Sequence, residues 1–298
     1  MKSLVNVKFC DFESAIKCDD FIYNRFDKQK NREFAIIEVS DSRSTQYIQI
    51  MLDDKIATLG VWLLELSRKQ LSFICKFIFK NFKNITTILA PFTNVGVGFF
   101  IKKNHYDLKL TGPTLIADTM RKKHLREIEK QRRRLVELLG LERFENYKSE
   151  DCPDSVMNFY FFNKRNNMGV DYKLDTKTYF DKYNVSDIYA LYYGNRIVSV
   201  LLSCEQCSKV YIENLTFDKE LSRCSPGKLI YMSYINILIQ KGFLRLYLGG
   251  GDYEYKTYFG SEKKERFICT IKRHRVMHFF MYIKRFIKRL LKIFCKEK

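Results

Sequence analysis

The sequence predicts an α+β fold built on a mixed, mostly antiparallel sheet with flanking helices. Two observations support this prediction. Strand-like runs come in groups of three joined by tight turns, which is typical of antiparallel meanders. Each group is followed by a segment with apolar residues at helical spacing and then by one more strand-like run. Both halves of the chain contain this order, although no repeat of the sequence itself can be recognised.

The N-terminal half contains the first meander. Its apolar runs predict strands over 33–39, 46–52 and 56–64, a helix over 70–82, and a returning strand over 85–92. The helix is predicted from apolar residues at positions 71, 74, 75, 78, 79 and 82, which share one face at 3.6 residues per turn.

The second half begins with a long helix over 120–139, which has one apolar face, one densely cationic face and Gly140 as a stop signal. Further helices are predicted over 155–167, 176–184 and 229–242. Strands are predicted over 188–195, 196–205, 208–217, 243–251 and 266–273.

The charge of the chain is concentrated in two places. The 298 residues carry a net charge of +19, and the segments 120–134 and 272–298 together hold 15 of these charges. Two local basic patches indicate an acidic surface or ligand that is contacted at defined places. No recognised DNA- or RNA-binding module accompanies the charge, so a nucleic-acid partner is not expected.

Metal, disulfide and membrane-spanning features are not expected. The nine cysteines are odd in number and scattered, and Cys204 and Cys207 form a lone pair without two further zinc ligands. Buried, reduced thiols and a reducing cytoplasm fit this pattern. The first residues lack the features of a signal peptide, and no window offers about 20 uncharged residues for a spanning helix.

A phosphate-type loop precedes the helix over 229–242. Ser225 is placed to cap the helix, Pro226 suits a first turn, and Gly227 allows close approach to the backbone. Free N–H groups at a helix start attract phosphate, and Lys228 adds a cation. An ordinary helix cap is the alternative, because neither a P-loop nor a dinucleotide-binding fingerprint is present.

The stretch from Ser225 to Gly260, SPGKLIYMSYINILIQKGFLRLYLGGGDYEYKTYFG, resembles the C-terminal signature of CelD-type cellulose-biosynthesis acetyltransferases. These belong to the Gcn5-related N-acetyltransferase superfamily, and Fem-type transferases are more distant relatives with two copies of the fold. The resemblance implies an acyl-CoA N-acyltransferase fold in two tandem copies, the N-terminal one degenerate. The implied division is 1–115 for the degenerate copy, 116–273 for the acyl-CoA-binding domain and 274–298 for a basic C-terminal helix.

In this superfamily acyl-CoA lies where the strand before the phosphate loop and the strand after the helix splay apart. The resemblance therefore implies acetyl-CoA or another acyl-CoA as co-substrate, without a metal, and an amine acceptor. The implied cofactor-binding residues are Ser225, Gly227, Lys228 and Leu229. The implied catalytic residues are Glu213, Asp252, Tyr255 and Lys256. Two alternatives remain: Glu213 as a carboxylate paired at a strand edge, and Asp252 with Lys256 as a buried pair that holds the loop.

The segment 276–298 has an apolar face opposite a row of Lys and Arg, which is typical of a helix lying in an anionic membrane surface. A helix packed on its own domain, or a dimer contact, is the alternative. We therefore expect a cytoplasmic protein that is peripheral on the inner face of the cytoplasmic membrane. The resemblance suggests as acceptor an amino sugar or another precursor of a surface polysaccharide or cell envelope. The alternatives are a weakly catalytic or non-catalytic membrane-associated protein of the same fold and a Fem-type aminoacyl transferase. The oligomeric state is left open.

Overall fold

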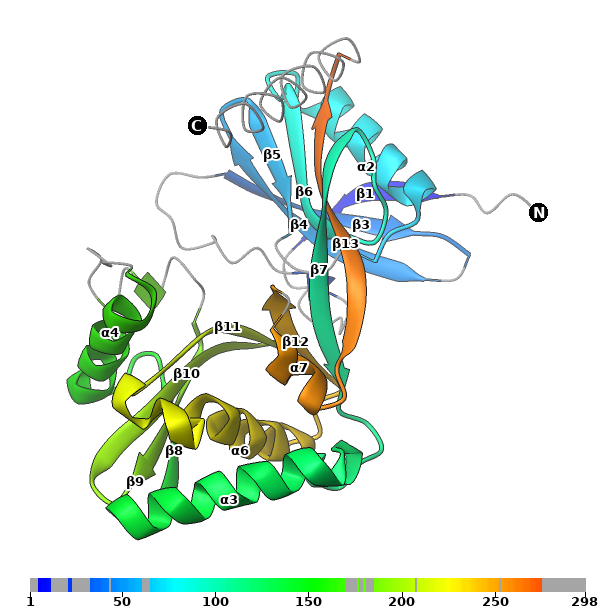
Figure 1. Ribbon diagram of the computed structural model, residues 1–298. Coiled ribbons are helices and arrows are strands. Elements are labelled where there is room, and N and C mark those ends of the chain that lie inside the picture. The colour runs from blue at the N-terminus through cyan, green and yellow to red at the C-terminus, as the bar shows by residue number, and fades with distance from the viewer. Residues whose placement is uncertain are drawn as a thin grey trace, which may run out of the picture. The chain divides into compact units, whose positions relative to one another are not determined.

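The structure is a computed structural model that describes residues 5–11, 21–22, 33–42, 44–60, 65–169, 176, 179–180, 185–206, 208–251 and 253–274 (Figure 1). The chain folds into two compact units. The N-terminal unit is Met1–Lys103 together with Glu265–Lys298, and the C-terminal unit is Asn104–Lys264. This grouping differs from the limits expected at residues 115 and 273, because the strand Phe99–Lys109 pairs with a strand of the second half and the strand Glu262–Lys272 pairs with a strand of the first half.

The elements follow one another in this order: β1 Asn6–Cys10, β2 Phe21–Ile22, β3 Glu33–Ser40, β4 Thr45–Asp53, β5 Ile56–Leu59, α2 Arg68–Asn81, β6 Thr87–Thr93, β7 Phe99–Lys109, η1 Ile116–Thr119, α3 Lys122–Leu139, β8 Glu142–Lys148, α4 Asp154–Met168, β9 Asp187–Tyr193, β10 Arg196–Gln206, β11 Lys209–Phe217, η2 Lys219–Cys224, α6 Pro226–Gln240, β12 Arg245–Gly250, α7 Glu254–Tyr258 and β13 Glu262–Lys272.

The N-terminal unit contains the first predicted meander. Its strands are ordered β1-β3-β4-β5-β6-β13, with the short β2 beside β4. The pairs β3–β4 and β4–β5 are antiparallel, and β5 and β6 are parallel because α2 connects them. A capping box starts α2: Gln70 N–H donates to Ser67 Oγ, and Ser67 N–H donates to Gln70 Oε1. The buried face of α2 then packs on the sheet through Leu71, Ile74 and Ile78.

The C-terminal unit contains the second meander, with its strands ordered β7-β12-β11-β10-β9-β8. Its sheet is covered on both faces. Tyr189 and Leu191 of β9 belong to the core cluster shared with α3 and α6, whereas Ile188 and Ala190 belong to the cluster shared with α4. Side chains of a strand alternate between faces, so every residue of β9 is buried. Figure 1 shows α3 and α6 together, with α4 apart from them.

The two units have the same topology, and this confirms the two tandem copies. In each, a strand pairs antiparallel with the first strand of a three-stranded meander, a helix follows, and a strand parallel to the end of the meander comes next. The sixth strands are exchanged. β7 follows β6 along the chain but pairs with β12, whereas β13 follows β12 but pairs with β6.

Several elements differ from the sequence expectations. β7, β8 and the short α7 were not predicted, and α6 begins three residues earlier than the expected 229. Of the expected short helix over 176–184, only residues 176, 179 and 180 are described, and all three are helical. The expected amphipathic helix over 276–298 lies outside the described residues. In the ranges that the structure does describe, no helix is both long and apolar enough to cross a membrane.

Candidate functional site

The strands β11 and β12 are paired only at their beginnings. Residues Lys209–Tyr211 pair with Arg245–Tyr247, after which β11 continues to Phe217 and β12 to Gly250 without mutual pairing. The two strands on either side of α6 therefore splay apart, as the resemblance implied.

A β-bulge lies at the point of divergence. Across β10, Ser203 faces Ile212 and Leu202 faces Asn214, so that Glu213 is the additional residue. Bulges redirect a side chain and interrupt the regular ladder, which is why they are frequent beside active sites. Glu213 is half-buried and its Oε1 atom is inaccessible to solvent. The predicted base thus sits where the strands begin to separate.

The start of α6 is shaped by three consecutive residues. Ser225 occupies the N-cap with φ 50° and ψ 49°, and its side chain makes no capping hydrogen bond. The expected side-chain cap is therefore wrong, because the left-handed backbone at Ser225 closes the turn instead. Pro226 has no N–H, and the N–H of Gly227 has no acceptor within the described part of the chain. A Cβ on Gly227 would lie 3.3 Å from Leu215 Cδ2 and 3.4 Å from Phe217 Cδ1.

These residues line a pocket of about 220 Å³. It joins the N-terminus of α6 to the end of β11 and to Tyr255 of α7, and its lining residues are Leu215, Phe217, Ser222, Ser225, Pro226, Gly227, Lys228, Tyr231 and Tyr255. The structure thus brings together four of the predicted site residues. Leu229 is not among them: its side chain is fully buried in the core, and its N–H donates to Ser225 O at 3.3 Å.

Two tyrosines form the apolar wall of this pocket. The hydroxyl oxygens of Tyr231 and Tyr255 lie 3.2 Å apart. Burial raises the pKa of Tyr255, and the hydrogen bond with Tyr231 opposes that rise. Burial also raises the pKa of Tyr231 well above its usual value. Both are therefore neutral phenols at physiological pH, and each hydroxyl can donate a proton. Tyr231 was not predicted, because within a helix it is indistinguishable from a core aromatic.

A second contact joins α6 to the start of α3. Lys228 Nζ lies 4.5 Å from the ring centre of Tyr258, and His124 stacks on the same ring at 4.0 Å. These contacts hold the Lys228 amino group and the His124 ring on one tyrosine ring. A cation over an aromatic face is favourable, so Lys228 is held rather than free in solvent.

Lys256 occupies a cage made by the three consecutive glycines. Its side chain is 2% exposed, and Nζ donates to Gly249 O at 3.2 Å, Gly250 O at 2.6 Å and Gly251 O at 3.3 Å. Positive φ angles of 73° at Gly249 and 91° at Gly251 turn the carbonyls inward. The glycine carbonyls thus bind the ammonium group, and these contacts hold the loop. The alternative of an Asp252–Lys256 pair is untested, because Asp252 lies outside the described residues. The predicted catalytic role of Lys256 remains a prediction.

A buried lysine contacts β11 from the opposite helix. Lys164 of α4 is 4% exposed, and its Nζ donates to Asn214 Oδ1 and, at 3.3 Å, to Leu215 O. Burial lowers the pKa of Lys164 to about 8. Lys164 thereby fixes β11 immediately after the bulge at Glu213. It was missed because a lysine in a predicted amphipathic helix is usually solvent-exposed.

Two other predictions meet different outcomes. Asp252 lies outside the described residues, so its predicted role is untested. The cysteines within the described ranges are free thiols: Cys10, Cys75, Cys152, Cys204, Cys224 and Cys269. Across the same ranges no cluster of three or more potential metal ligands occurs.

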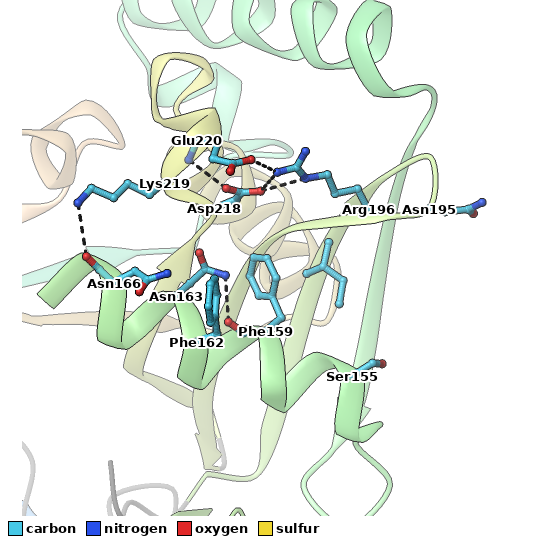
Figure 2. Close-up of a pocket in the computed structure, with 11 residues that line it drawn as sticks. Ser155, Phe159, Phe162, Asn163, Asn166, Asn195, Arg196, Asp218, Lys219 and Glu220 are labelled. Carbon is cyan, nitrogen blue, oxygen red and sulfur yellow. Dashed lines mark hydrogen bonds and ion pairs between the residues drawn. The ribbon is translucent and has the colours of Figure 1, made fainter. Parts of the chain in front are cut away.

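A larger pocket of about 520 Å³ lies elsewhere in the C-terminal unit (Figure 2). Phe159 and Phe162 of α4 form part of its lining, and Arg196 forms another part. The Arg196 guanidinium donates to Asp218 and Glu220, with nitrogen–oxygen distances of 2.5 and 2.6 Å (Figure 2). None of the predicted site residues lines this pocket, whose charged groups neutralise one another.

Comparisons with known proteins agree with this geometry. A family model described as "Acetyltransferase (GNAT) domain" matches residues 122–257. No curated protein sequence matches the chain. Among solved structures, FemX superposes with a TM-score of 0.62 at 9% identity, covering 88% of this chain and 96% of FemX.

Two lipid-synthetase structures are also similar. The C-terminal domain of a putative lysylphosphatidylglycerol synthetase from Agrobacterium fabrum gives a TM-score of 0.52 at 10% identity, with 79% of this chain and 83% of that one covered. L-PGS from Bacillus licheniformis gives 0.51 at 11%, with 79% and 84% covered. At such low identities these likenesses concern the fold alone.

Proposed function

We propose that the protein transfers an acyl group from acyl-CoA to an amine of a cell-envelope precursor. The acyltransferase activity follows from the GNAT acetyltransferase domain matched at residues 122–257. In this proposal a small acyl group passes to an amino sugar or another precursor of a bacterial surface polysaccharide or cell envelope. The protein would work in the cytoplasm, peripheral on the inner face of the membrane.

The observation that carries the proposal is the pocket that joins the start of α6 to Tyr255 beside the splayed strands. Its lining combines two kinds of group. The N–H of Gly227, the positive end of the α6 dipole and the nearby Lys228 suit a diphosphate. Leu215, Phe217 and Tyr231 suit a long, weakly polar arm. These residues fit the two parts of acyl-CoA.

In the proposed reaction one side chain accepts a proton and another donates one. Acyl-CoA supplies an activated thioester carbonyl, which the neutral amine of the acceptor attacks. Glu213 accepts the proton that the amine nitrogen loses as the new C–N bond forms. Tyr255 donates its hydroxyl proton as the C–S bond breaks, because burial keeps that phenol protonated. Asp252 is retained in the proposal as a residue that orients the acceptor.

The test is release of free CoA from acetyl-CoA in the presence of phosphorylated and nucleotide-linked amino sugars. Tyr255→Phe and Glu213→Gln should each lower kcat by about 100-fold, the usual contribution of a positioned acid or base, with acetyl-CoA affinity nearly unchanged. Tyr253→Phe is the matched control, because this neighbouring tyrosine is 57% exposed and does not line the pocket.

Binding is measured separately by isothermal titration. Gly227→Val should weaken acetyl-CoA binding, because the added atoms would contact Leu215 and Phe217 and occupy space in the pocket at the start of α6. If the wild-type protein does not bind acetyl-CoA at millimolar concentration, the proposed donor is wrong. If it binds acetyl-CoA but acetylates none of the amino sugars, only the proposed acceptor is wrong.

The similarity to FemX over most of both chains favours a second candidate, transfer of an aminoacyl group from an aminoacyl-tRNA. Under this candidate, activity would require charged tRNA and would disappear on treatment with ribonuclease. Acetyl-CoA turnover that is insensitive to ribonuclease would exclude it.

A further inference from the structure

The outer face of α3 carries a continuous row of cations. Taking about 100° per residue, six basic side chains fall within an arc of about 120°, and from first to last they span about 18 Å along the axis. These residues, which we call the basic strip, are Lys122, Lys123, Arg126, Lys130, Arg133 and Arg134. All six are exposed. The opposite side of α3 is anchored in the core by Ile128 and Leu135.

The described residues do not neutralise the basic strip. None of its six residues makes an ion pair with the described part of the chain, whereas the neighbouring Arg132, on the other side of the helix, is bonded to Glu142 at 2.8 Å. Glu129 also lies 3.6 Å from Arg132, and Glu127 accepts a hydrogen bond from Gln131. Of the acids of this helix, Glu127 and Glu129 are thus committed elsewhere, and only the exposed Glu137 shares the face of the strip, one turn beyond its last residue. The strip therefore presents a concentrated positive field.

Exposed leucines stand at the C-terminal end of the strip. Leu138, in the last turn of α3, is 66% exposed, and Leu141, just after α3, is 79% exposed. Exposing large apolar side chains beside a dense charge row brings no benefit in water. It is, however, the arrangement by which peripheral proteins combine attraction to anionic lipids with apolar insertion.

The chemistry of the strip favours a lipid surface over a polynucleotide. Base recognition and single-strand binding rely on aromatic side chains for stacking, and the strip contains none. His124, the nearest ring in the sequence, is turned away and stacks on Tyr258. Leucines at the end of the strip have no counterpart in binding to a phosphate backbone, but they suit the boundary between head groups and acyl chains.

We propose that the basic strip of α3, with Leu138 and Leu141 at its end, is a docking surface for an anionic lipid bilayer. This surface belongs to the C-terminal unit and is separate from the segment 276–298. Through His124, Tyr258 and Lys228 the start of α3 is connected to the start of α6, so docking would present the pocket close to the head groups. The inference rests on the face of α3 and holds whichever acceptor is used.

The test measures binding of the full chain to vesicles of phosphatidylcholine with or without one-third phosphatidylglycerol. The variant Lys130→Gln/Arg133→Gln/Arg134→Gln should bind the anionic vesicles about 100-fold more weakly, since each cation near such a surface contributes about a fivefold factor. The matched control is Lys76→Gln/Lys80→Gln/Lys83→Gln, which removes the same charge from exposed positions in and just after α2 and should bind almost as the wild type does.

Apolar insertion is tested with Leu141→Ser, which should weaken binding about tenfold even at high salt, where charge attraction is screened. Phe162→Ser, at a 64% exposed position on α4, is its control. Circular dichroism and thermal melting verify that each variant folds. Equal vesicle affinities for the strip variant and its lysine control would overturn the proposal. So would unchanged vesicle binding accompanied by loss of binding to a short RNA, which would assign the strip to a polynucleotide.

Discussion

Replacement of Lys256 by Met removes the ammonium group from the glycine cage while keeping most of the stem. The three N–H donors of the lysine are matched by three carbonyl oxygens, of Gly249, Gly250 and Gly251. Hydrogen bonds from a charged donor contribute about 1.5–3 kcal/mol each. Desolvation of the ammonium opposes this by several kcal/mol. We therefore expect the free energy of unfolding to fall by about 3 kcal/mol, as the carbonyls lose their donor.

The change is measured by urea denaturation followed by circular dichroism, with the m-value compared between variants. Lys219→Met is the control, because this exposed side chain makes a single hydrogen bond of 3.5 Å to Asn166 O. If Lys256→Met and Lys219→Met alter the free energy of unfolding by the same small amount, the cage does not hold the loop.

Two further predictions concern tight packing and buried charge. Gly194→Ala should destabilise the protein by at least about 3 kcal/mol, since a Cβ there would lie 2.2 Å from Leu139 O. A Cβ at Gly112 would meet no atom within 4 Å, so Gly112→Ala should lower the free energy of unfolding by only about 1 kcal/mol, because of the φ of 108°. Equal melting temperatures for the two variants would contradict this prediction. Burial lowers the pKa of Lys164 from 10.5 to about 8 in the folded state, so the unfolded chain binds more protons between these values and stability rises with pH there. The free energy of unfolding of the wild type minus that of Lys164→Met should therefore increase by roughly 3 kcal/mol between pH 8 and pH 10.5. If this difference does not change with pH, Lys164 is not buried as described.

Much of the fold followed from local patterns in the sequence. The meanders and the helices α2, α3, α4 and α6 were recognised because their periodicity and stop signals are local. β8 was missed because its residues ERFENYK are polar, with a burial pattern of an edge strand. β7 was missed because its first half, FFIKKN, is half-buried or exposed and its apolar and polar residues do not alternate. Which copy each of these strands completes depends on long-range pairing, which no local pattern specifies.

The candidate site was predicted in part. Gly227, Lys228 and Tyr255 meet at one pocket because the helix start and the segment after β12 carry recognisable motifs. Tyr231 and Lys164 were not identified, since their importance depends on which side of a helix faces which strand. The contacts of the three glycines could not be predicted from the sequence. Their carbonyls surround Lys256, which lies five to seven positions further along the chain, because the backbone turns back on itself there.

The exchange of β7 and β13 has a consequence for synthesis on the ribosome. When the chain has emerged as far as residue 110, it already includes β7, which pairs with a strand of the second copy. The first copy lacks its sixth strand until Glu262–Lys272 is made. Neither sheet can therefore be completed by its own half of the sequence, and fragments divided near residue 115 would each carry a strand that the other requires. The two halves are interlaced, so an intact fold depends on nearly the entire described chain being present at once.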